Sequence, residues 1–302
     1  MYYKYRNGNA IVLIDPEDGS RIIHTDDDDI DLEFPLNIDV SIGRRCDGGC
    51  AFCYEGATPD GPEADLSDVP FLESLHPYTE FAVNGNGVNH TQLVPFLEKL
   101  KEKHIIANMT VNQIHFERKE DLIADLIERK LIHGLGVSLR SPTPEFISKA
   151  QKYPNLVVHT IVGVHGPKDY VSLCGKGLKV LILGYKDKGR GHDYLLANAS
   201  ESIINNCSYL KEEIANILEH NWYPVIAFDN LALSQLNVKS CVSADVWERY
   251  YQGDEGTASM FIDLTDKTFG ISSMVQKSEM MPMTDDIVEM FRIVKEKAHG
   301  NV

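Results

Sequence analysis

Apolar and polar positions alternate in blocks through the middle of the chain. From residue 36 onward, short apolar runs typical of buried strands alternate with stretches that have helical periodicity. The strands are predicted to begin near Leu36, Glu80, Ile105, Gly134, Leu156 and Leu178. The helices between them are predicted at 66–75, 91–103, 119–130, 144–152 and 168–175. This alternation predicts an α/β fold with parallel βαβ units, in which six units form a sheet that need not close.

The two ends of the chain depart from this alternation. The N-terminal part predicts a small β-hairpin with strands at 10–14 and 21–24, followed by four aspartates that we interpret as a solvated turn. A metal-binding loop is the alternative for the aspartates, but they lack the spacing and the glycine of an EF-hand. In the C-terminal part we predict helices at 199–220, 244–251 and 285–297, a strand at 224–228 and a hairpin at 259–272. We therefore expect a hairpin appendage (1–35), a main α/β domain (36–230) and a small α+β extension packing on it (231–302).

Composition and charge narrow the classes of partner. The chain has 302 residues, of which 43% are hydrophobic, so it can bury a core of ordinary size. Its 45 acidic and 29 basic residues give a net charge of −16, which repels phosphates, so binding to bulk nucleic acid is not expected. The N-terminus lacks the apolar segment of a secretory signal, and no apolar run is long enough to span a bilayer. We expect a cytoplasmic protein without a membrane partner.

Three cysteines lie close together directly after the first predicted strand. Cys46, Cys50 and Cys53 fall in the stretch Cys-Asp-Gly-Gly-Cys-Ala-Phe-Cys. A [4Fe–4S] cluster normally takes four cysteines, so three thiolates leave one iron open to a substrate or cofactor. A structural zinc site is the alternative, but it needs a fourth ligand and usually a second Cys or His pair at short spacing. The remaining cysteines are isolated in the sequence, which favours the iron–sulfur interpretation: Cys174, Cys207 and Cys241.

The pattern Cys-x3-Cys-x2-Cys, with Phe52 before the last cysteine, resembles the signature of the radical S-adenosylmethionine superfamily. The resemblance implies a partial (β/α)6 barrel in which the three cysteines hold a [4Fe–4S] cluster and S-adenosylmethionine binds the remaining iron. It also implies reductive cleavage of S-adenosylmethionine to a 5′-deoxyadenosyl radical, which abstracts hydrogen from an organic substrate. An external electron donor of the flavodoxin or ferredoxin type is implied as well. The chain is similar to compact, single-cluster members, some of them encoded by bacteriophages.

The turn after the second predicted strand resembles a known cofactor-binding segment. Its residues Asn84-Gly85-Asn86-Gly87 stand where the family's Gly-Gly-Glu segment receives the ammonium group of S-adenosylmethionine. This chain has Asn86 where Glu is common, so only backbone contacts are implied there. The alternative is a simple turn between a strand and a helix.

The ends of the later strands resemble the family's remaining cofactor contacts. Asn112 and Ser138 match positions that contact the ribose, and Arg140 matches a position that binds the methionyl carboxylate, for which a guanidinium group is well shaped. The alternative for each is a role in capping a helix or shaping a loop. The resemblance places the adenine near Phe52, Val162, Gly184 and Tyr185.

The sequence says less about the substrate. The catalytic candidates are Arg140, His159 and Asp229, and the alternative for the histidine is a hydrogen-bonded structural role. A basic loop indicates either an anionic group on the substrate or a solvated segment, and it contains Lys186, Lys188 and Arg190.

The C-terminal segment bears on whether the substrate is a peptide or protein. Residues 253–263 weakly resemble the C-terminal extension of peptide- and protein-modifying members, but the tail holds a single cysteine, so no auxiliary cluster is predicted. We therefore expect an organic substrate, with a peptide or protein ahead of a nucleotide or small metabolite. A non-catalytic iron–sulfur or zinc-binding module is the rival interpretation.

Overall fold

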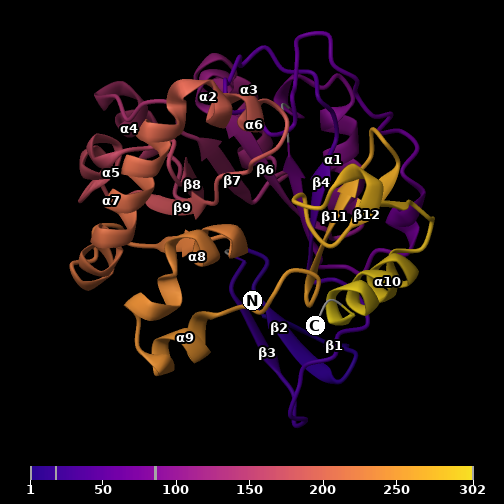
Figure 1. Cartoon of the computed structure of the whole chain (residues 1–302). Coiled ribbons are helices and arrows are strands. Elements are labelled where there is room, and N and C mark those ends of the chain that lie inside the picture. The colour runs from indigo at the N-terminus through magenta and orange to yellow at the C-terminus, as the bar shows by residue number, and fades with distance from the viewer. Residues whose placement is uncertain (1, 18, 85–86, 301–302) are drawn as a thin grey trace.

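A curved, largely parallel sheet forms the centre of the molecule. The computed structural model describes residues 2–17, 19–84 and 87–300. In this part of the chain the main sheet has the strand order β10-β9-β8-β7-β6-β5-β4-β11-β12-β13. The strands that are parallel neighbours in chain order are β4 (Asn37–Ser41), β5 (Glu80–Asn84), β6 (Ile106–Asn112), β7 (Gly134–Ser138), β8 (Leu156–Ile161), β9 (Lys179–Leu183) and β10 (Ile226–Phe228). The predicted α/β fold with an open, barrel-like sheet is confirmed (Figure 1).

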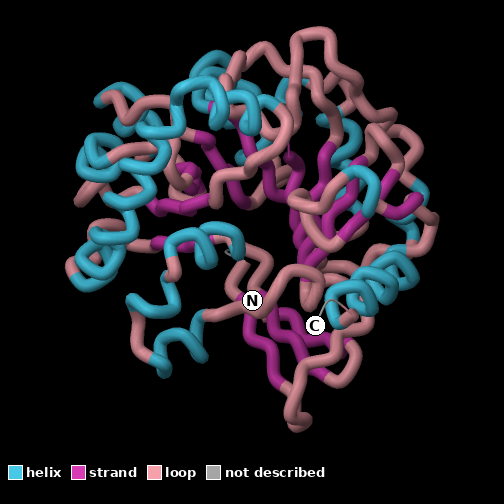
Figure 2. The backbone as a smooth tube through the Cα atoms, in the orientation of Figure 1, coloured by secondary structure: helices cyan, strands magenta, loops and turns pink. Residues whose placement is uncertain are grey.

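Helices lie on the outer side of the curved sheet (Figure 2). Most follow a strand and lead to the next one, as parallel pairing requires. They are α1 (Leu93–Glu102), α2 (Gln113–Arg118), α3 (Glu120–Glu128), α4 (Pro144–Ala150), α5 (Pro167–Leu173), α6 (Arg190–Tyr194), α7 (Ser200–Glu219), α8 (Asn230–Leu236) and α9 (Ala244–Tyr250). Among the described residues, no helix combines the length and the apolar character that a bilayer crossing requires.

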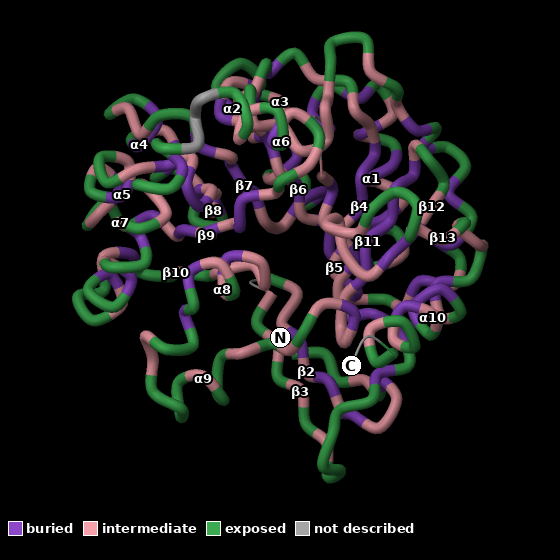
Figure 3. The backbone as a smooth tube through the Cα atoms, in the orientation of Figure 1, coloured by how far each residue is buried: buried purple, intermediate pink, exposed green. Residues whose placement is uncertain are grey.

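The strands of the main sheet bury one face against the helices and turn the other toward the inside of the curve, because successive side chains point to opposite sides. In β6, Ala107 and Val111 are buried toward the helices, whereas Asn108 and Thr110 on the opposite face border the inside of the curve. The same alternation recurs in the neighbouring strands, and Figure 3 shows buried backbone concentrated along them. The concave side therefore carries polar side chains on β4 to β6 and mainly apolar ones on β8 and β9.

The C-terminal segment extends the main sheet. The predicted hairpin is present as β11 (Ser259–Asp263) and β12 (Thr268–Gly270), which pair antiparallel, and β13 (Met281–Pro282) follows. In addition, β11 pairs in parallel with β4, which the sequence pattern did not indicate. Arg44 pairs with Asp263 and Asp266, so an ion pair ties the loop after β4 to the end of β11. The final helix α10 (Ile287–His299) buries one apolar face through Ile287, Met290, Phe291 and Val294.

The N-terminal segment forms a separate antiparallel sheet. The two predicted strands are confirmed as β2 (Ala10–Ile14) and β3 (Arg21–His24), and β1 (Tyr3–Asn7) joins them as a third strand that was not predicted. Lys295 of α10 donates hydrogen bonds to the Asp31 carboxylate at 2.6 Å and to the Leu32 carbonyl at 2.5 Å, which holds this sheet close to the C-terminal helix (Figure 1).

Two local predictions were wrong. The helix expected at 66–75 is only a short 3-10 turn at Pro70–Glu73. Val69 has an extended backbone (φ −121°, ψ 87°), because the ring of the following proline disfavours the helical region. No helix was predicted at 113–118, but this segment forms helix α2, which the Asn112 side chain caps by accepting from the Ile114 N–H.

Candidate active site

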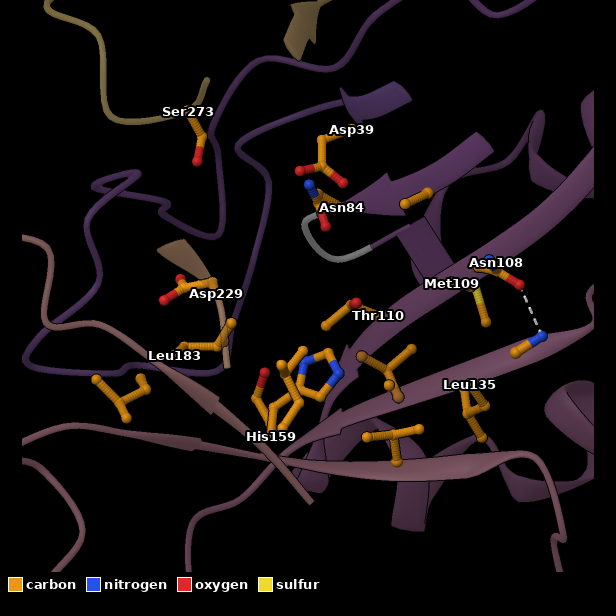
Figure 4. Close-up of a pocket in the computed structure, with 18 of the residues that line it drawn as sticks. Asp39, Asn84, Asn108, Met109, Thr110, Leu135, His159, Leu183, Asp229 and Ser273 are labelled. Carbon is orange, nitrogen blue, oxygen red and sulfur yellow. Dashed lines mark hydrogen bonds between the residues drawn. The ribbon is translucent and has the colours of Figure 1, made fainter. Parts of the chain in front are cut away.

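A cavity of about 740 Å³ lies on the concave side of the main sheet, bordered by residues of β4 to β10 and of the loops that follow them. It extends along the whole length of the strands, because both Glu80 and Asn84 of β5 line it, as do Gly134 and Ser138 of β7. Its volume falls within the range of roughly 300–1,000 Å³ that is usual for ligand sites. Figure 4 shows side chains from several strands pointing into this space.

The cysteine loop borders the cavity beyond the carboxyl end of β4. Cys46, Cys50 and Cys53 all line the cavity. Backbone bonds hold the loop in place, because the Cys46 N–H donates to the Thr58 carbonyl at 2.8 Å. The Arg190 guanidinium donates to the Cys50 carbonyl at 3.1 Å and to the carbonyl of Ala57 at 2.8 Å. A cation from the segment after β9 therefore fixes the loop that carries the three thiols.

Polar hydrogens point at two of the three sulfur atoms. The Gly48 N–H lies 3.3 Å from the Cys46 Sγ, and the Asn112 amide lies 3.3 Å from the Cys50 Sγ. Burial raises the pKa of both thiols, and for Cys50 the guanidinium groups of Arg140 and Arg190 act in the opposite direction.

These residues are compatible with a [4Fe–4S] cluster. The thiols are free of disulfides and half-buried, and N–H groups directed at the sulfurs are a common means of tuning such clusters. In the described ranges, no three Cys, His, Asp or Glu side chains converge as one bound metal ion requires. A cluster binds each thiolate through a different iron, so its ligands need not meet at one point. The other cysteines lie elsewhere, with Cys174 after α5, Cys207 on α7 and Cys241 before α9.

The structure brings most of the predicted cofactor residues to the cavity. Those that line it are Phe52, Asn84, Asn112, Ser138, Gly184 and Tyr185. Of the predicted residues that the structure describes, Gly87, Arg140 and Val162 do not line it, and Gly85 and Asn86 lie outside the described residues. Phe52 packs edge-to-face against Tyr194, with ring centroids 6.0 Å apart.

Several predicted contacts already have protein partners. Asn112 donates to Cys50 and caps α2, so both ends of its amide are engaged. Arg140 donates to the Gly48 carbonyl at 3.4 Å, which places its guanidinium beside the cysteine loop. A Cβ at Gly184 would lie 2.3 Å from Leu231, so close packing against α8 explains why this position is glycine. These contacts favour roles in positioning the loop and the strand ends.

The basic loop after β9 is bonded to the protein. Lys186 donates to the Ser273 hydroxyl at 2.6 Å and lies 4.1 Å from the ring centroid of Tyr54. Lys188 donates to the Ser273 carbonyl at 2.8 Å, and Arg190 holds the cysteine loop. The loop therefore connects the C-terminal segment to the cysteine loop, and its three cations have partners within the protein.

His159 lies inside the cavity, in the middle of β8 (Figure 4). Its Nδ1 is buried and has no hydrogen-bond partner among the described residues. Burial lowers the pKa of the imidazole to about 4, so the ring is neutral at physiological pH. Gly136 of β7 makes room for this ring, because a Cβ there would lie 2.3 Å from the His159 Cε1 and 2.9 Å from the Thr110 Oγ1.

The sequence analysis missed most of the acidic residues of the cavity wall, which also include Glu17, Glu55 and Glu80. Asp39 of β4 and Glu255 of the loop before β11 line the cavity together with Asp229, which had been predicted. For Asp39 a signal existed, because the run Asn-Ile-Asp-Val-Ser alternates polar and apolar residues and so places Asp39 on the polar face. Glu255 reaches the cavity only because β11 pairs with β4, and no local pattern indicates that pairing.

Comparisons by sequence find nothing to which the chain can be assigned. No protein-family model matches the sequence, and no curated protein matches it significantly.

Comparison of structures identifies the fold. The structure of SuiB from Streptococcus suis bound to S-adenosylmethionine matches with a TM-score of 0.59 and 11% sequence identity, over 89% of this chain and 80% of that chain. A second structure of Streptococcus suis SuiB matches with a TM-score of 0.57 and 13% identity, over 89% of this chain and 81% of that chain. The chain therefore shares the fold of a protein crystallised with S-adenosylmethionine, in agreement with the fold that the cysteine pattern implied.

Proposed function

We propose that this chain is a radical S-adenosylmethionine enzyme that acts on an organic substrate. Cys46, Cys50 and Cys53 hold the [4Fe–4S] cluster, and S-adenosylmethionine occupies the adjoining part of the cavity. When bound, the reduced cluster and S-adenosylmethionine supply a 5′-deoxyadenosyl radical that abstracts hydrogen from an unactivated C–H bond. The observation that carries the proposal is the position of the three thiols. They lie beyond the carboxyl ends of the parallel strands, and all of them border one cavity.

The chain's own residues would position the loop and contact the cofactor. Arg190 and Asn112 hold the cysteine loop through the Cys50 carbonyl and sulfur, and Arg140 holds it through the Gly48 carbonyl. The strand ends that carry Asn84, Ser138 and Tyr185 border the same space and are proposed to contact the cofactor.

The likeness to SuiB supports this assignment at the level of the fold, since that structure has S-adenosylmethionine bound. The proposal includes a peptide or protein as the favoured substrate and an external donor of the flavodoxin or ferredoxin type. It also includes a cytoplasmic location, where reducing conditions preserve free thiols.

Cluster assembly and cofactor cleavage test the proposal together. The full chain is reconstituted anaerobically with iron and sulfide, both elements are counted, and 5′-deoxyadenosine is measured after reduction with added S-adenosylmethionine. We expect about four irons per chain and formation of deoxyadenosine. Cys50→Ala should lose both, whereas the matched control Cys174→Ala, on a cysteine outside the loop, should retain both.

Two outcomes would contradict the assignment. A cluster that survives in Cys50→Ala would show that the ligands are different. A complete cluster without any deoxyadenosine would favour a non-catalytic iron–sulfur module, and a colourless zinc protein would remove the cluster altogether.

A further inference from the structure

Three carboxylates from distant parts of the chain border the same cavity. Asp39 lies on β4, Asp229 directly follows β10, and Glu255 lies in the loop before β11. The pKa of the Asp39 carboxyl is raised by burial first and then by the charges of Glu255 and Asp229, so the three groups act on one another electrostatically. Figure 4 shows Asp39 and Asp229 on different segments that border the same space. We call these three residues the acidic set.

The acidic set is incompletely paired. Asp229 accepts from the Gly184 and Ala232 N–H groups at 2.8 and 2.7 Å, and Glu255 interacts with Ser272. For the Asp39 carboxylate, no hydrogen-bond donor is found among the described residues. The polar groups of the cavity therefore leave at least one carboxylate free to bind a ligand.

A single lysine balances the acidic set. Among the described cations, Lys186 is the one that lowers the pKa of all three carboxyls. Its ammonium group is already engaged by the Ser273 hydroxyl and the ring of Tyr54. When ionised, these three half-buried carboxylates and one ammonium leave an excess of negative charge, to which the nearby Glu80 adds. Such an excess is costly unless protons or a bound cation compensate for it.

A second, independent group in the cavity lacks a partner. His159 on β8 belongs to a different strand and is neutral, and its Nδ1 is buried without a hydrogen-bond partner in the described residues. A buried polar atom of this kind is uncommon in a folded protein, and the ring that carries it lines the cavity. The cavity thus offers a ligand both negative charge and a neutral hydrogen-bonding ring.

We propose that the organic substrate carries an ammonium or guanidinium group, which the acidic set binds through Asp39 and Glu255 while His159 hydrogen-bonds to a neutral polar part of the same molecule. This inference rests on the proposed function, because it names the substrate class of that site. The net charge of −16 adds to it, since an acidic protein attracts cationic molecules toward its cavity. The ammonium group of S-adenosylmethionine has the same chemistry and must be distinguished by experiment.

Binding of matched probes tests the charge requirement. The probes are N-acetyl-lysine methylamide and N-acetyl-norleucine methylamide, of which only the first carries an ammonium group. Their affinities are measured by ligand-observed NMR on the full chain, both as purified and after cluster reconstitution with saturating S-adenosylmethionine and no reductant. We expect the lysine probe to bind about ten-fold more tightly or better, as a charge-assisted hydrogen bond provides.

Substitutions of the carboxylates test which residues cause the preference for the lysine probe. Asp39→Asn and Glu255→Gln should each reduce the preference for the lysine probe by about ten-fold, whereas Glu212→Gln on the exposed face of α7 should leave it unchanged. Asp229 is left intact because its carboxylate caps α8.

The possible outcomes separate the two proposals. Equal affinity for the two probes in both forms of the chain would overturn the inference, as would a preference that survives in the Asp39→Asn/Glu255→Gln double variant. If Asp39→Asn instead weakens binding of S-adenosylmethionine about ten-fold and the probes do not differ, the acidic set serves the cofactor and the substrate proposal is wrong. Absence of deoxyadenosine in the wild-type chain contradicts the proposed function without affecting the probe result.

Discussion

Replacing Asp39 by asparagine should stabilise the protein at neutral pH. Burial and the neighbouring carboxylates raise the pKa of Asp39 from 3.8 to about 6, so ionising this group in the folded state costs free energy. Because one pKa unit corresponds to about 1.4 kcal/mol, ionised Asp39 destabilises the fold by about 3 kcal/mol above pH 6. Asparagine has nearly the same shape and no charge, so it removes this cost.

The sign of the effect follows from which state binds the proton more tightly. Between pH 4 and 6 the folded chain holds the Asp39 proton while the unfolded chain has released it, so the wild type loses stability as the pH rises through this window. Below the unfolded pKa of 3.8 both states are protonated, and the cost disappears. The gain from Asp39→Asn should therefore be nearly full above pH 6 and fall to about 0.5 kcal/mol at pH 4.

Urea unfolding at pH 4 and at pH 7.5 measures the difference directly. We expect the free energy of unfolding of Asp39→Asn to exceed that of the wild type by about 1–3 kcal/mol at pH 7.5 and by about 0.5 kcal/mol or less at pH 4. Glu212→Gln, an exposed carboxylate on α7, is the control and should show no such dependence. A difference that does not change with pH, or a variant that is less stable at pH 7.5, would refute the account of Asp39 as a carboxylate without sufficient counter-charge.

Three further changes test other contacts. Gly136→Ala should lower the free energy of unfolding in urea by about 1–3 kcal/mol, because its Cβ would overlap the His159 ring. The loss should be smaller when His159 is also replaced by alanine. Strictly additive losses in the double variant would contradict this contact. Lys186→Met should raise the pKa of Asp39 further, since Lys186 lowers it; an unchanged midpoint in an NMR titration of the carboxyl carbon would speak against that contact. Phe291→Ala on α10 should cost about 3–5 kcal/mol in urea unfolding because the ring is fully buried, and a loss below 1 kcal/mol would be inconsistent with that burial.

The sequence predicted the repeating part of the fold because strand–helix alternation is a local property. The expected strands near Glu80, Gly134 and Leu156 begin at those residues in the structure, and helix α4 begins at Pro144 as predicted. The helix expected at 66–75 does not form, although its apolar residues have helical spacing, because Pro70 disfavours the helical conformation of the residue before it.

The candidate site was predictable where a motif is compact in the sequence. The three cysteines fall within one short loop, so their proximity needs no knowledge of the fold. Glu255 could not be predicted, because its place in the cavity depends on the pairing of β11 with β4 across more than half of the chain. The hydrogen bonds of Lys186 and Lys188 could not be predicted either, because their partner Ser273 lies in the same distant C-terminal segment.

The parallel pairing of β11 with β4 has a consequence during synthesis on the ribosome. Arg44 and its partner Asp263 are 219 residues apart, so at roughly 5–20 residues per second the nascent chain exposes the free edge of β4 for on the order of 10–40 s. An uncovered edge strand can recruit strands from other molecules. Newly made chains should therefore depend on chaperones for as long as β11 has not emerged, and slow translation of the last third of the message should lower the yield of native protein.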